Sequence, residues 1–134
     1  MPIVDVETAV ARAIRELLTT ALAGTCAVYD HPPRDAAMPF VTFDRHLTQP
    51  EDDLAEWMSV HDVTLTVWSD TRGPKQVREI LGGIRKALHQ VPLTLAAGEA
   101  VSCRVERTDA TRDADGVTYM GTAQISVLTD NKDS

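Results

Sequence analysis

The sequence predicts an α+β domain, in which a mainly antiparallel sheet of about four to five strands is covered on one face by two helices. Two segments carry apolar residues three and four positions apart, which is the spacing of one face of a helix. Elsewhere apolar residues alternate with polar ones, as in strands that are buried on one side. A two-layer sandwich buries both kinds of apolar surface against each other.

The first helix is expected to begin after Asp5, because an aspartate at this position can cap the free N–H groups of a first turn. Gly24 is expected to end it, since glycine readily adopts the left-handed conformation found after many helices. Its apolar face would comprise Val6, Ala9, Val10, Ala13, Ile14, Leu17, Leu18, Ala21 and Leu22.

The second helix is expected to begin near Pro74, because proline suits a first turn, and to end before Pro92. Gly82 and Gly83 fall in its middle, at a cost of about 1 kcal/mol each relative to alanine. We expect them to let the helix backbone approach the sheet closely. The apolar face would comprise Val77, Ile80, Leu81, Ile84, Ala87, Leu88 and Val91.

The predicted strands are residues 28–30, 40–47, 63–68, 101–106 and 118–127, with Pro32 and Pro33 stiffening the turn after the first. Two loops join the later strands. One is the acidic stretch 48–56 and the other is the stretch 108–116. We expect one domain over residues 1–134, with a polar tail from about residue 129.

The composition excludes several classes of protein. A net charge of −7 argues against an outer surface that binds nucleic acid non-specifically, because such binding draws on basic groups. No apolar run approaches the roughly 20 residues of a membrane span, and the N-terminus does not resemble a signal peptide. Cys26 and Cys103 belong to no motif, so we expect reduced thiols in a protein made in the cytoplasm.

The sequence offers no arrangement suited to catalysis or to metal binding. Asp113 and Asp115 match the middle of a calcium loop, but Thr111 and Thr122 stand where its first and last acidic ligands belong. No glycine-rich phosphate loop is present. The histidines also lack the spacing of a zinc site. The sequence therefore predicts no catalytic residue, no metal site and no cofactor.

The polar loops and the two tryptophans are the candidates for contacts with other protein subunits. Trp68 is expected on the sheet face opposite the core, where it either packs beneath a neighbouring segment or anchors an interface. Trp57 has the same two interpretations. The candidate contact residues are Glu51, Asp52, Asp53, Leu54, Trp57, Trp68, Arg112 and Asp113.

In its order and spacing of elements, the chain resembles the tail-completion proteins, or tail terminators, of siphophage-like tails and gene transfer agents. The resemblance covers about Val6 to Leu128 and is carried by several short pieces together. These pieces are Leu22-Ala23-Gly24, Val28-Tyr29-Asp30, Pro32-Pro33, Met38-Pro39-Phe40-Val41, Leu65-Thr66-Val67-Trp68-Ser69, the helix from Ile80 to Leu88, and Asp115-Gly116-Val117-Thr118-Tyr119. One departure is His31, directly before the two prolines, where the family often has a small residue.

The resemblance implies an α+β sandwich that forms a homo-hexameric ring at the head-proximal end of a tail. Such a ring stops growth of the tail tube and joins it to the head connector (stopper or adaptor) protein. DNA passes through its lumen without sequence-specific binding, and no membrane is involved. From the residues alone, two other interpretations stay open: a small cytoplasmic protein-binding adaptor without catalysis, and a small enzyme built on an unusually reactive cysteine or histidine.

Overall fold

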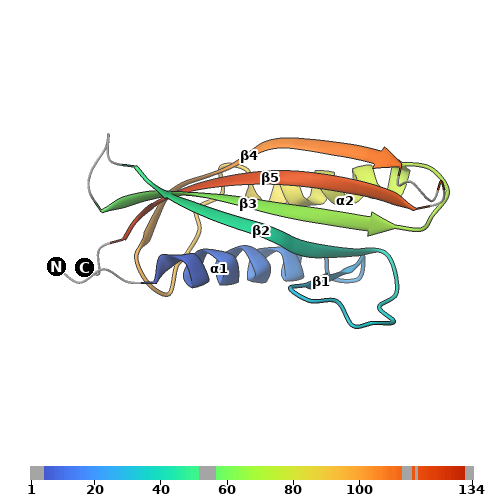
Figure 1. The fold of residues 1–134 in the computed structure, drawn as a ribbon, viewed down its shortest axis with the longest axis horizontal. Helices are drawn as coiled ribbons and strands as arrows, with labels where there is room; N and C mark the ends of the chain where they lie inside the picture. Colours follow the sequence, from blue (N-terminus) through green and yellow to red (C-terminus); the bar gives the residue numbers. More distant parts are fainter. Residues whose placement is uncertain (1–4, 52–56, 113–115, 117, 132–134) are drawn as a thin grey trace.

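The computed structural model describes residues 5–51, 57–112, 116 and 118–131 (Figure 1). Two helices and a five-stranded sheet make up an α+β arrangement, as predicted. The elements follow in the order α1 (Val6–Ala21), β1 (Ala27–Tyr29), β2 (Phe40–Pro50), β3 (Met58–Ser69), α2 (Lys75–Leu88), β4 (Glu99–Arg112) and β5 (Tyr119–Asp130).

The strands are ordered β1-β2-β3-β5-β4 across the sheet. The short strand β1 is parallel to β2, and every other neighbouring pair is antiparallel. The chain crosses from β3 through α2 to the far edge, and β5 then returns between β3 and β4. Both helices lie on the same side of the sheet, which leaves its other face uncovered by helix (Figure 1).

The first helix begins and ends where the sequence indicates. The Asp5 carboxylate accepts a hydrogen bond from the Thr8 backbone N–H at 3.2 Å and another from the Thr8 hydroxyl at 2.8 Å. These bonds hold the pKa of Asp5 below its ordinary value, because they stabilise the charged carboxylate. After α1 the chain turns at Gly24, whose φ is +80°.

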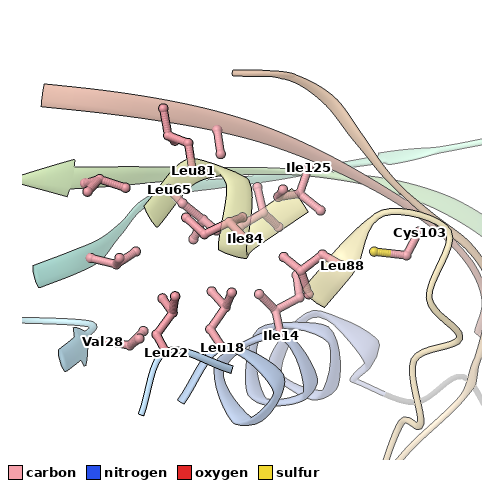
Figure 2. Close-up of a cluster of buried hydrophobic side chains, with 14 of the residues drawn as sticks. Ile14, Leu18, Leu22, Val28, Leu65, Leu81, Ile84, Leu88, Cys103 and Ile125 are labelled. Atoms are coloured by element: carbon pink, nitrogen blue, oxygen red, sulfur yellow. The ribbon is translucent and has the colours of Figure 1, made fainter. Parts of the chain in front are cut away.

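The core lies between the sheet and the two helices and consists almost entirely of aliphatic side chains (Figure 2). Side chains from α1 point toward α2, and those of α2 pack against the sheet. The largest fully buried hydrophobic residues are Ile14, Leu18, Leu65, Ile80, Ile84, Leu88 and Ile125.

The close approach of α2 to the sheet is present, but the helix glycines do not provide it. A Cβ atom at Gly82 would meet nothing within 4 Å, and one at Gly83 would lie 3.1 Å from Leu22 Cδ2, near the end of α1. The glycine beneath α2 is Gly121 in β5. A Cβ atom there would lie 2.5 Å from a methyl group of Val77, so the space is available only to glycine.

Both predicted loops are shorter than the sequence suggests, because β2 continues to Pro50 and β4 to Arg112. The extent of β4 was underestimated because the register shifts between Val105 and Arg107. Such a bulge changes which residues face the core, so the regular alternation of apolar and polar residues in the sequence stops there. Helix α2 ends at Leu88, earlier than expected, and Gln90 just beyond it has a φ of +57°.

Candidate interaction surfaces

The candidate contact residues that the structure describes fall at two opposite ends of the sheet. At one end Glu51 and Trp57 flank the connection between β2 and β3. The Glu51 N–H donates to the Met58 carbonyl at 2.9 Å, and the Asn131 N–H donates to the Trp57 carbonyl at 2.8 Å. The start of α1 and the end of β5 lie at this end as well (Figure 1).

Trp68 and Arg112 lie at the other end. Trp68 comes near the end of β3, and Arg112 is paired with Tyr119, which is itself paired with Ser69. The two ends of β3 are about 36 Å apart along the strand. The described candidates thus form two distant groups, Glu51 with Trp57 and Trp68 with Arg112. Asp52, Asp53, Leu54 and Asp113 lie outside the described residues.

Arg112 is the last residue of a strand, so its predicted place within a loop is wrong. Its Nε and Nη2 atoms donate hydrogen bonds to the Tyr119 hydroxyl oxygen at 3.3 and 3.1 Å. Its guanidinium carbon also lies 5.6 Å from the centre of the Tyr119 ring, within the range of a cation–π contact. This exposed arginine is therefore oriented by the strand next to it.

Trp68 lies on the uncovered face of the sheet, as predicted, and lines a hollow of about 370 Å³. The hollow is mainly apolar and opens beside β1 and the chain segment before β2. Its lining includes Pro32, Met38, Phe40, Thr42, Asp44 and Trp68. Asp30, at its rim, forms an ion pair with Arg15 of α1 at 2.9 Å.

A chain of hydrogen bonds in this hollow ends at the carboxylate of Asp44. The Trp68 indole N–H donates to the Thr42 hydroxyl oxygen at 3.2 Å, and the Thr42 hydroxyl donates to Asp44 Oδ1 at 2.9 Å. The Thr66 hydroxyl donates to Asp44 Oδ2. Asp44 is not among the candidates predicted from the sequence, although an acidic residue directly after the apolar and β-branched run 40–43 is a usable signal.

The outer edge of the sheet is partly closed by the end of α2. The Gln90 N–H donates to the Cys103 carbonyl of β4 at 2.8 Å, and the Val105 N–H donates to His89 Nδ1 at 3.1 Å. These bonds occupy edge groups that could otherwise pair with another strand. His89 thus covers part of a strand edge.

Two of the four histidines, scattered in the sequence, meet in the structure. His46 of β2 and His61 of β3 are in hydrogen-bond contact, and His61 is fully buried. Burial lowers the pKa of both rings, and that of His61 falls to about 4, helped by the neighbouring His46. Among the described residues, no three histidine, cysteine or acidic side chains are close enough together to hold a metal ion.

The two thiols are in environments that disfavour the reactive thiolate. Burial raises the pKa of Cys26, and it raises that of Cys103 to about 11. Both cysteines are free. Within the described ranges, neither helix has the length and apolar character needed to cross a membrane.

Comparison with known proteins identifies the family. The model of the family "Tail completion protein gp17" matches residues 8–130 of the chain. The chain belongs to this family. It is thus a structural protein of a phage-like tail, and the predicted resemblance is confirmed. No curated protein matches it.

Solved structures of similar fold are consistent with that family. A chain of the "Virion of native gene transfer agent (GTA) particle" superposes with a TM-score of 0.81 at 20% identity, covering 93% of this chain and 97% of that one. The bacteriophage SPP1 gp17 protein superposes with a TM-score of 0.52 at 19% identity, covering 93% and 94%. At such identities the likeness concerns the fold.

Proposed function

We propose that this tail-completion protein forms a homo-hexameric ring that ends the tail tube and joins it to the head connector protein. The observation that carries the proposal is the family match over residues 8–130. It is supported by the likeness in fold to a chain of a gene transfer agent virion. The ring would occupy the head-proximal end of the tail after assembly in the cytoplasm of the host.

The arrangement of candidate contacts suits a protein that lies between two different partners. Glu51 and Trp57 lie at one end of the sheet, and Trp68 and Arg112 lie at the other. With the strands running roughly along the ring axis, one end meets the tail tube and the other meets the connector. A ring with two unlike ends can accept the tube on one side and refuse further tube subunits on the other.

DNA would pass through the lumen without being held by it. The net charge of −7 disfavours binding to phosphates, because affinity for DNA depends on basic groups that displace counterions. Sequence-specific contacts are not needed for passage. A ring of acidic subunits therefore suits a conduit.

The protein is proposed to act without catalysis or cofactors. The raised thiol pKa values of Cys26 and Cys103 leave little thiolate at neutral pH, which disfavours an enzyme built on a reactive cysteine. Labelling of the folded protein with a thiol reagent should be slow at both positions. Rapid labelling of either one at pH 7 would revive the enzyme interpretation.

Electron microscopy of particles from a producing strain that lacks the gene tests the proposal. Loose heads together with unattached or overlong tails are expected, and a plasmid copy of the gene should restore joined particles. Normal, fully joined particles from the deletion strain would contradict the proposal. The adaptor interpretation, a small cytoplasmic binding protein, would then take its place.

A further inference from the structure

The hollow beside Trp68 combines an apolar wall with a carboxylate that still has capacity to accept hydrogen bonds. A carboxylate has about four acceptor positions on its two oxygens, and Thr42 and Thr66 each use one on Asp44. Within the described part of the chain no cationic side chain forms an ion pair with Asp44, since the single pair there joins Arg15 to Asp30. Asp44 is exposed.

The backbone of β2 determines where the Asp44 carboxylate lies. The pairing of β2 with β3 shifts between Phe43 and Arg45, so Asp44 is the extra residue of a bulge. Asp44 follows Thr42 by two residues and therefore lies on the same face of the sheet, where the two threonine hydroxyls fix its orientation.

An arginine side chain fits such a site. Its planar guanidinium can donate two parallel hydrogen bonds to a carboxylate, and it also stacks on aromatic rings such as that of Trp68. Its aliphatic stem can lie along the apolar wall formed by Met38 and Phe40.

The opposite edge of the same sheet supplies arginines that have no ion-pair partner within the described residues. Arg104 and Arg107 of β4 are both exposed. They are paired with Ser126 and Gln124 of β5. Gln124 accepts a hydrogen bond from Thr64 on the uncovered face, so Arg107 belongs to that face too.

Of these two arginines, Arg107 is the one at the same position along the strands as Asp44. Arg45, next to Asp44, is paired with Thr64, which is paired with Gln124, which in turn is paired with Arg107. Asp44 and Arg107 therefore lie at the same height along the strands, on the same face and toward opposite edges of the sheet. With the strands along the ring axis, as proposed above, rotation about that axis keeps the two residues at the same height, so they are placed to meet across each contact between identical subunits.

From this arrangement we infer that the hollow lined by Asp44 and Trp68 receives the Arg107 side chain of the next copy of the chain. The inference rests on the proposed ring and names the contact that joins its subunits. It makes the contact head-to-tail, with an acidic and aromatic hollow on one side and a basic strand edge on the other.

Charge reversal in the complemented deletion strain tests the contact. Asp44→Arg and Arg107→Asp should each reduce the number of joined particles about tenfold or more, because each leaves like charges facing across every contact. The double variant should restore joining. Asp44→Asn removes the charge with little change of shape and should give an intermediate loss.

Arg104→Asp is the matched control, because it makes the same change on the same strand at another height and should leave joining near the wild-type level. Melting temperatures of the purified variants should stay near that of the wild-type protein. Wild-type particle numbers from both Asp44 variants, or loss with Arg104→Asp but not with Arg107→Asp, would overturn the inference and leave the ring itself in place. A deletion strain with normal particles would instead remove the proposed function.

Discussion

The Nε2 atom of His46 lies 2.8 Å from the Nδ1 atom of His61, on the neighbouring strand. On the other side of its ring, His61 Nε2 lies 3.0 Å from the hydroxyl oxygen of Thr129. That hydroxyl donates to Asn131 at 2.8 Å, so it accepts from His61. By this assignment His61 carries its proton on Nε2, and its Nδ1 accepts the N–H of His46. Because burial lowers the pKa of both rings, both are mainly neutral at pH 7 in the folded protein.

We predict that stability falls when the pH is lowered from neutral toward pH 4. The pKa of His61 is about 4 in the folded chain and 6.5 when the residue is free of the fold. The unfolded chain thus binds the proton more readily, so this contribution to stability is complete above pH 6.5 and is lost by about pH 4. Melting temperatures measured between pH 7.5 and pH 4.5 check the expectation.

His61→Gln should flatten this dependence on pH, whatever it does to the melting temperature at neutral pH. The matched control is His31→Gln, because His31 is exposed in the turn after β1 and should leave the slope unchanged. An unaltered slope in the His61 variant would show that other groups cause the acid sensitivity.

Gly121→Ala is predicted to destabilise the domain by about 1–3 kcal/mol, as overpacked cores do. The added Cβ atom would lie 2.5 Å from Val77 Cγ1 and 2.9 Å from Leu81 Cδ1, so α2 would have to move away from the sheet. Gly82→Ala makes the same chemical change in open space and should instead stabilise by up to about 1 kcal/mol. Urea denaturation of the two variants gives both changes in unfolding free energy. Changes of the same sign in the two variants would refute the prediction.

Leu65→Ala should cost about 2–5 kcal/mol of unfolding free energy, because this side chain is fully buried between the sheet and α2. Thr64→Ala, one residue earlier, removes a side chain on the uncovered face and a single hydrogen bond to Gln124. Its expected cost is about 1 kcal/mol. Similar losses of unfolding free energy for both variants in chemical denaturation would contradict the burial of Leu65 in the core.

Replacing Glu51, Asp52 and Asp53 together by alanine is predicted to leave the melting temperature nearly unchanged while lowering the yield of joined particles. The reason is that the segment is strongly polar and lies outside the pattern of core residues. Calorimetry and particle counts measure the two effects separately. A large fall in melting temperature with normal assembly would assign the segment to folding instead of contact.

The sequence by itself was sufficient to predict the two helices, the sheet covered on one face and the family. Local periodicity is visible in the sequence and is enough to predict helix faces and alternating strands. Examples are the helix faces Ile14–Leu18 and Ile84–Leu88 and the strand residues 63–67. Caps such as Asp5 are equally local.

Tertiary structure decided what depends on strand register. The bulge after Val105 interrupts the alternation of residues, so the full length of β4 could not be predicted from that alternation. Pairing of β2 with β3 brought together His46 and His61, which are 15 positions apart. The close packing of α2 on β5 requires glycine at position 121 of the strand. The sequence pointed instead to the two glycines of the helix. Each of these features joins residues distant in sequence, and periodicity carries no information about such partners.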